Sequence, residues 1–332
     1  MSGHFNISVQ VTAFILTFLL ALVAGPIFIP VLRRLKLGQT VRDDGPSTHL
    51  KKSGTPIMGG VIFIIPITLV SIYFSLKQHS DIIPLVIVTL GFGAIGFIDD
   101  FIKVVMKRKD GLFWDQKMFG LLIVAATFTI YAVKTDILNS EIIVPFMGME
   151  YTVSIPMWAF VPFTIFVLLA ITNAVNLTDG VDGLAAGVTL IVMVFFTIIA
   201  MTRGEWDYLK IFSSIAAGGC LGFLAFNVYP AKVFMGDTGS LALGGVVGAI
   251  SILMKMPWII LVAGLIYVIE ALSVIIQVAY FKRTRKRVFK MAPIHHHFEL
   301  SGWKETKVVL VFWGITVICC IIGLLTLRLK FF

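Results

Sequence analysis

The chain has 332 residues, of which 58% are hydrophobic and only 14% are charged, and its formal net charge is +9. A soluble domain is close to half apolar and about one quarter charged, so this composition excludes an ordinary water-soluble protein and favours many lipid-facing segments. In a membrane protein a basic balance is typical of basic cytoplasmic loops, and no nucleic-acid partner is predicted.

Ten apolar stretches have the length of about 17–25 residues that a helix needs to cross a hydrocarbon core of about 30 Å. They lie near residues 10–32, 56–76, 83–101, 117–134, 156–174, 184–201, 211–228, 238–255, 258–281 and 307–327. The chain is therefore predicted to be an all-α polytopic membrane protein with a single integral membrane domain over residues 1–332. Residues 138–155 alternate Ile, Val and Tyr around Pro145 and Gly148, which predicts a short hairpin outside the membrane.

Lys and Arg residues are shared unevenly between alternate loops: one set of loops carries twenty and the other seven. Cytoplasmic loops are the ones rich in Lys and Arg, so the first set is predicted to be cytoplasmic, and with ten spans both termini lie outside. The dense polar clusters then all fall on the cytoplasmic side, at residues 42–55, 99–117, 173–183, 227–240 and 282–299. Loops that are far apart in sequence are thus expected to form one cytoplasmic site.

Asp99 and Asp100 end the third predicted span, and Lys103 follows about one helical turn later. A carboxylate at the bilayer centre costs about 2.5–3.5 kcal/mol on insertion scales, so paired acids at the end of a span require cations or water. Two interpretations of these residues stay open: an ion pair at the membrane interface, or part of a functional site.

The end of the fifth span carries four polar residues at intervals of three, namely Asn173, Asn176, Asp179 and Asp182. In a continuous helix they would share one face, but Gly180 and Gly183 are expected to turn the chain. Helix capping by Asp182 would explain one acid and leave the other three polar residues unexplained.

Asp237 stands between Gly236 and the segment Thr238-Gly239-Ser240, where the eighth span begins. Free backbone N–H groups at a helix start bind phosphate, and a carboxylate beside them is a natural Mg²⁺ ligand. The alternative is a turn in which Asp237 caps the helix.

Three consecutive histidines, His295–His297, lie in a segment that runs to Glu299. Adjacent imidazoles suit phosphate or hydroxyl contacts in a folded loop better than one shared metal, and a solvated loop is the alternative.

The basic run at 282–290 is typical of contact with anionic headgroups, with a lipid phosphate as the other candidate. Glu270, inside the ninth span, shares a face with Gln277 and is expected to face protein or a water-filled groove.

Together, carboxylates, cations and amides at one membrane surface indicate phosphoryl transfer between a soluble nucleotide and a lipid.

Five ordered motifs, spread over almost the whole chain, resemble those of the polyprenyl-phosphate N-acetylhexosamine-1-phosphate transferases. They are Gly54-Thr-Pro-Ile-Met-Gly-Gly60, Asp99-Asp100, Asn176-Leu-Thr-Asp-Gly-Val-Asp-Gly-Leu-Ala185, Phe234-Met-Gly-Asp-Thr-Gly-Ser240 and Pro293-Ile-His-His-His-Phe-Glu299. The histidine motif is similar to that of the phosphomuramoyl-pentapeptide branch and differs from relatives that attach N-acetylglucosamine phosphate. One departure is Ile57, where threonine is expected, so one hydroxyl contact near the substrate is expected to be weakened.

The resemblance implies a Mg²⁺-dependent reaction of peptidoglycan synthesis in the bacterial cell membrane, in which UDP-MurNAc-pentapeptide and undecaprenyl phosphate give lipid I and UMP. It also implies that Asp237 holds Mg²⁺ and that Asp99 engages or deprotonates the lipid phosphate, with Asp100 beside it. The implied nucleotide-sugar site consists of Asn173, Asn176, Asp179, Asp182, Asn227 and Phe234, the last as a candidate to stack on uracil. The groups implied to neutralise phosphates are Lys52, Lys103, His295, His296 and His297. The ninth span, with Glu270 and Gln277, would border a groove for the polyprenyl chain.

Direct attack by the lipid phosphate and a phospho-enzyme on an aspartate both fit these residues. The oligomeric state also stays open, a homodimer included. The rival functions are a sister transferase that uses UDP-GlcNAc and a transporter or channel. A transporter predicts acids at span centres and often repeated halves, whereas these acids cluster at one face and no repeat is evident.

Overall fold

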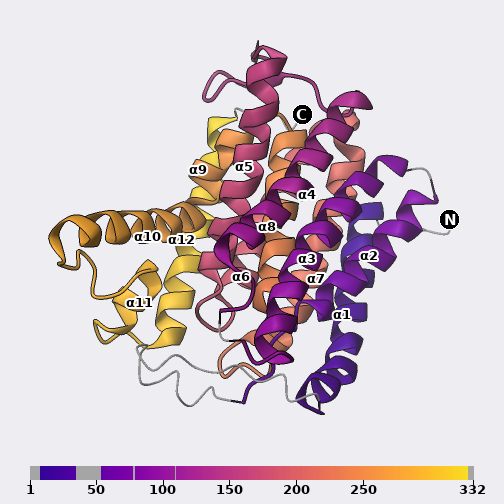
Figure 1. The fold of residues 1–332 in the computed structure, drawn as a ribbon. Helices are drawn as coiled ribbons and strands as arrows, with labels where there is room; N and C mark the ends of the chain where they lie inside the picture. The colour runs from indigo at the N-terminus through magenta and orange to yellow at the C-terminus, as the bar shows by residue number, and fades with distance from the viewer. Residues whose placement is uncertain (1–7, 35–53, 78, 109, 328–332) are drawn as a thin grey trace.

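A computed structural model describes residues 8–34, 54–77, 79–108 and 110–327, and Figure 1 shows them as a bundle of helices with a small hairpin at one end. The helices are α1 (Val9–Arg34), α2 (Val61–Ser75), α3 (Ile83–Val104), α4 (Trp114–Lys134), α5 (Met157–Thr178), α6 (Leu184–Ala200), α7 (Asp207–Asn227), α8 (Gly236–Leu253), α9 (Ile260–Ala263), α10 (Leu265–Thr284), α11 (Ile294–Glu299) and α12 (Glu305–Thr326). Single 3₁₀ turns occur at Ser80–Ile82, Gly204–Trp206 and Pro257–Ile259.

The apolar helices confirm a polytopic membrane protein. Within the described residues, eight helices are long and apolar enough to cross a membrane, and α2 and α6 are shorter apolar helices. Within the described residues, nine of the ten predicted spans each coincide with one apolar helix, because lipid-facing and core-facing residues alike must be apolar in such a protein. The prediction that both termini lie outside concerns ends of the chain beyond the described ranges and stays a prediction.

The ninth predicted span, 258–281, is not one helix. Gly264 leaves the helical conformation, with φ −99° and ψ 22°, and separates α9 from α10. In Figure 1 α10 extends sideways from the bundle, and α11 lies below it. A glycine weakens a helix by about 1 kcal/mol relative to alanine, and a hydropathy window does not register such a break. Most apolar side chains of α10 are therefore left exposed, and its buried face is limited to Ile266, Tyr267, Glu270 and Ser273.

The hairpin predicted within 138–155 is present as β1 (Glu141–Ile143) paired antiparallel with β2 (Thr152–Ser154). It is fastened to the connection after α8: Lys255 Nζ lies 2.7 Å from Glu141 Oε2, and the Trp258 indole donates to the Ile143 carbonyl at 2.7 Å. The Lys255 ammonium lowers the pKa of the Glu141 carboxyl. The hairpin thus marks the end of the bundle at which α8 finishes.

Candidate functional site

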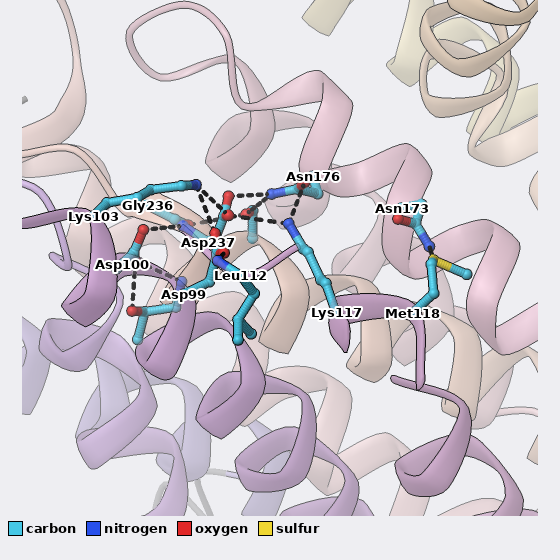
Figure 2. Close-up of polar contacts among 12 residues, drawn as sticks. Asp99, Asp100, Lys103, Leu112, Lys117, Met118, Asn173, Asn176, Gly236 and Asp237 are labelled. Atoms are coloured by element: carbon cyan, nitrogen blue, oxygen red, sulfur yellow. Dashed lines mark hydrogen bonds and ion pairs between the residues drawn. The ribbon is translucent and has the colours of Figure 1, made fainter. Parts of the chain in front are cut away.

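Three carboxylates from two helices meet at the other end of α8 (Figure 2). Asp99 and Asp100 lie in the last turns of α3, Asp237 lies in the first turn of α8, and one oxygen of each lies within 4.8 Å of the others. The helices can approach this closely because Gly96 has no side chain: a Cβ there would lie 2.0 Å from the backbone oxygen of Asp237. The predicted convergence of two distant acidic segments is therefore confirmed.

Asp237 is surrounded by three donors from three other helices. Its Oδ2 accepts from Lys103 Nζ at 2.8 Å and from Lys117 Nζ at 3.0 Å, and its Oδ1 accepts from Asn176 Nδ2 at 2.7 Å. The Asp237 side chain keeps 16% of its surface exposed. It does not cap α8, whose N-cap residue Met235 makes no side-chain capping bond. The capping alternative for Asp237 is therefore wrong.

Asp100 is the anion that occupies the start of α8. Its carboxylate accepts from the backbone N–H groups of Asp237 (3.2 Å) and Thr238 (2.9 Å) and from the Thr238 hydroxyl (2.7 Å). The sequence predicted that these N–H groups would be free for a substrate phosphate. That expectation needs correction, because a helix N-terminus binds whichever anion lies within reach, and here the chain supplies its own. Asp100 is only 2% exposed.

Asp99 forms the ion pair expected from its spacing to Lys103, with 2.6 Å between Oδ2 and Nζ. Its Oδ1 accepts from the Leu112 backbone N–H at 2.7 Å, which holds the connection between α3 and α4 against the site. Lys103 therefore bridges Asp99 and Asp237. The cluster holds three carboxylates and two ammonium groups, so its formal charges leave one negative charge.

The segment from Asn173 to Asp182 does not keep one polar face. Helix α5 continues to Thr178, beyond the predicted end of its span, so Asn176 reaches Asp237 and also donates to Ser240 Oγ at 2.8 Å. Asn173 lies apart from the cluster in Figure 2, where its amide donates to the Leu169 carbonyl at 2.8 Å and approaches the sulfur of Met118 at 3.8 Å. The chain then turns, as predicted, and Gly183 has a φ of +81°.

Asp182 and Asn227 bind backbone groups of neighbouring loops. Asp182 does not cap α6, since its Oδ2 accepts from the Ala231 N–H at 2.9 Å and its own N–H donates to Glu305 Oε1 at 2.7 Å. Asn227 accepts from the Gly183 N–H at 3.1 Å and donates to the Val233 carbonyl at 3.0 Å. Both side chains are buried, at 5% and 2% exposure, and they lock the turn after α5 to the loop after α7.

The glycine-rich segment before α2 pairs with the loop that carries Phe234. The Phe234 N–H donates to the Pro56 carbonyl at 2.9 Å, and the Gly59 N–H donates to the Phe234 carbonyl at 2.8 Å. Phe234 is half-buried, as is Asp179 at the end of α5. Ile57 is 8% exposed and belongs to the apolar core, so an isoleucine suits this position. Lys52 lies outside the described residues.

The three histidine side chains of α11 have three different partners. His295 is fully buried with Nδ1 3.0 Å from Glu270 Oε2, and His296 Nδ1 lies 2.8 Å from Glu299 Oε2. His297 Nδ1 accepts from the Lys290 N–H at 3.1 Å. The alternative of a solvated loop is wrong for this segment, which is a short packed helix. Gln277 accepts from the N–H groups of the residues at 288 and 289, and so ties the basic connection back to α10.

Lys117 and Ser240 join the cluster although the sequence did not predict them as site residues. Both lie within predicted cytoplasmic polar clusters, which is the signal that could have found them. Several cations lie in this basic segment, and the packing of α4 against α5 decides which of them reaches Asp237. Residue spacing does not specify that packing.

One family model matches the central half of this chain, and individual relatives match nearly its full length. The family described as glycosyl transferase family 4 matches residues 82–255. A phospho-N-acetylmuramoyl-pentapeptide-transferase of Acetivibrio thermocellus is 69% identical over 99% of this chain and 98% of its own length. Proteins of the same name from Clostridium novyi and Clostridioides difficile are each 50% identical, covering 96% and 94% of this chain and 97% and 95% of their own lengths. The chain therefore belongs to glycosyl transferase family 4 and, within it, to the phospho-N-acetylmuramoyl-pentapeptide transferases of the bacterial membrane.

Proposed function

We propose that this protein transfers phospho-N-acetylmuramoyl-pentapeptide from UDP-MurNAc-pentapeptide to undecaprenyl phosphate, with Mg²⁺, and so produces lipid I and UMP. The observation that carries this proposal is the cluster of Asp99, Asp100 and Asp237, flanked by Lys103 and Lys117, at the end of apolar helices. A reaction between a soluble nucleotide and a membrane lipid requires its charged groups at such a boundary.

The donor set suits magnesium. Mg²⁺ takes oxygen ligands, and commonly binds one or two carboxylates together with water and substrate phosphates. Asp237 is the best-placed ligand, because Asp99 and Asp100 are almost fully buried and already accept bonds from the backbone, while Asp237 remains partly exposed. Mg²⁺ held by Asp237 would supply positive charge beside the substrate phosphates, which favours phosphoryl transfer.

The residues around the cluster support phosphoryl transfer. The ammonium groups of Lys103 and Lys117 lie beside Asp237, where they can offset phosphate charge. Asp99 would orient or deprotonate the lipid phosphate, whose oxygen attacks the sugar-side phosphorus as the bond to UMP breaks. Attack by an aspartate to form a phospho-enzyme remains the alternative route.

The proposed nucleotide-sugar site lies where α5, the loop after α7 and α11 meet. Asn176, Asp179 and Phe234 are half-buried and can contact a bound nucleotide, with Phe234 as the candidate to stack on uracil. Asn173, Asp182 and Asn227 would shape this site through the contacts described above. The exposed apolar side chains of α10, including Leu272, Ile275 and Ile276, provide a surface for the polyprenyl chain, beside Gln277.

Incubating the purified protein with a panel of UDP-sugars, polyprenyl phosphate and Mg²⁺, and following UMP release, tests the function. We expect release only with the muramyl-pentapeptide nucleotide, and loss of release when a chelator removes the metal. Comparable turnover with UDP-GlcNAc would place the protein with the sister transferases, and no release with any nucleotide would defeat the proposal. Light scattering on the same preparation tests whether the protein is a monomer or a homodimer, which the sequence left open.

A further inference from the structure

Glu270 and His295 form a buried pair outside the carboxylate cluster. Glu270 lies in the first half of α10 and His295 in the first turn of α11, both side chains are 0% exposed, and Oε2 and Nδ1 are 3.0 Å apart. That distance fits an ion-pair contact, but within the described residues neither oxygen of Glu270 and neither ring nitrogen of His295 makes a hydrogen bond. Removing two ionisable groups from water carries a large free-energy cost, and a pair without hydrogen bonds regains little of it. Net stabilisation therefore does not account for this pair.

The opposite edge of the His295 ring lies directly against the turn after α5. A Cβ built on Gly180 would lie 2.1 Å from Nε2 and 2.5 Å from Cε1 of His295, so only glycine leaves room for the imidazole. Gly180 follows Asp179, and the same segment begins with Asn176, whose amide donates to Asp237. His295 is thus held between α10 and the chain segment that enters the carboxylate cluster.

The pair also fixes the neighbouring histidine. The ring of His296 packs edge-on against that of His295, with 4.1 Å between their centroids, and its side chain keeps 13% of its surface exposed. Of the three histidines, only His295 is fully buried, whereas His296 and His297 are half-buried. His295 is therefore placed to orient its neighbours, and they are placed to meet a substrate.

We propose that Glu270 is a positioning residue of the transferase site: through His295 it sets the place of α11, and with it the ring of His296, against the turn at 179–183. This inference rests on the proposed function and adds a residue that contacts no substrate in that reaction. It predicts that α11 shifts or loosens when the pair is broken, although the carboxylate cluster itself remains intact.

Glu270→Ala, Glu270→Gln and Gly180→Ala, made in the full chain, test the proposal. Glu270→Ala removes the partner of His295, Glu270→Gln keeps an oxygen that can accept from Nδ1, and Gly180→Ala displaces the ring without altering α10. Ser273→Ala is the matched control, because Ser273 is also buried on this face of α10 but, within the part of the chain that the structure describes, its hydroxyl donates only to the Glu270 carbonyl of its own helix. Each variant is measured for kcat and KM in UMP release, for its melting temperature, and for amide hydrogen exchange of residues 294–300.

We expect Glu270→Ala and Gly180→Ala to lower kcat at least tenfold and to speed exchange in residues 294–300 at least tenfold. Glu270→Gln should recover most of the wild-type kcat and most of the slow exchange in residues 294–300. Ser273→Ala should match the wild type in both measurements. Wild-type kinetics in both disruptive variants would overturn the proposal, as would unchanged exchange. A loss of melting temperature and activity in both Glu270 variants, with no rescue by glutamine, would reduce the pair to a structural contact. Hydrogen exchange needs no substrate, so it decides the role of Glu270 even if the wild-type protein proves inactive in the proposed reaction.

Discussion

Asp237 forms ion pairs with both lysines of the site. Replacing it tests whether its carboxylate binds the metal or only supports the structure. Asp237→Asn keeps the shape, but it lacks the negative charge, and its single oxygen can accept either from Asn176 or from the lysines, not from both. We expect UMP release to fall about 100-fold or more, because one electrostatic contact at a reacting centre is commonly worth 10²–10³ in rate. Mn²⁺ binding, followed by electron paramagnetic resonance, should weaken in parallel.

The control is Asp115→Asn, an exposed acid in the first turn of α4 that should behave as the wild type. If Asp237→Asn kept wild-type turnover and Mg²⁺ dependence, the metal site would have to be built on Asp99 or Asp100 instead.

Asp100 should respond differently from Asp237, although both belong to the same cluster. Its carboxylate satisfies two backbone N–H groups and a hydroxyl at the buried start of α8. In Asp100→Asn the amide NH₂ replaces one acceptor oxygen and leaves a buried donor unsatisfied, at a cost of about 1–3 kcal/mol. We expect a lower melting temperature in detergent for Asp100→Asn than for Asp237→Asn, because water can reach the partly exposed Asp237 side chain but not the buried Asp100. Equal melting temperatures for the two variants would contradict the assigned roles.

The residue types of the site could be predicted from sequence, but not their division of roles. Placing an acid at the end of a predicted span costs free energy, so acids found there commonly belong to a functional site. For this reason Asp99, Asp100 and Asp237 could be identified from the sequence. Whether a helix start binds a substrate phosphate or a carboxylate of its own chain depends on which anion packing brings there. Sequence could not show that Asp100 takes this place, nor that Lys117 approaches Asp237 from α4.

At the scale of elements, the contact between α3 and α8 sets the geometry of the cluster. Gly96→Ala would place a methyl group against the backbone oxygen of Asp237, which cannot move aside without shifting α8. Overpacking of this kind costs about 1–3 kcal/mol, so we expect a lower melting temperature together with a large loss of UMP release. The matched control is Gly93→Ala, one turn earlier on α3, whose Cβ would make an ordinary 3.4 Å contact with Ala242. Equal behaviour of the two variants would show that this helix contact does not control the site.

The helices themselves followed from the lengths of the apolar runs, because a span must be long and apolar whichever neighbours it has. The exceptions were set by tertiary structure. The end of α5 at Thr178 adds one turn beyond the apolar run and delivers Asn176 to the cluster. The break at Gly264 redirects α10 away from the bundle, and composition alone gives a continuous span there. Sequence therefore located the elements, while the bends and extensions that shape the site required the structure.

At the scale of the whole molecule, α8 links the two ends of the bundle. It has 18 residues and begins at the carboxylate cluster, and at about 1.5 Å per residue it is about 27 Å long, close to the thickness of a hydrocarbon core of about 30 Å. Lys255, just after its end, pairs with Glu141 of the hairpin. The cluster and the hairpin therefore lie at opposite ends of a membrane-length helix, as the biased distribution of Lys and Arg requires if the hairpin lies outside.

This arrangement gives a topological prediction that does not depend on activity. The native Cys220, Cys319 and Cys320 are buried, so a cysteine placed at an exposed position can be labelled selectively. Tyr151→Cys lies in the hairpin region, and Lys232→Cys lies in the loop before α8. With a membrane-impermeant maleimide on spheroplasts, we expect Tyr151→Cys to be labelled at once and Lys232→Cys only after lysis. The ten predicted spans would place both termini on one side, so we also expect a reporter fused after Phe332 to be active outside the cytoplasm. Labelling of Lys232→Cys in intact spheroplasts, or a reporter active only in the cytoplasm, would contradict this orientation.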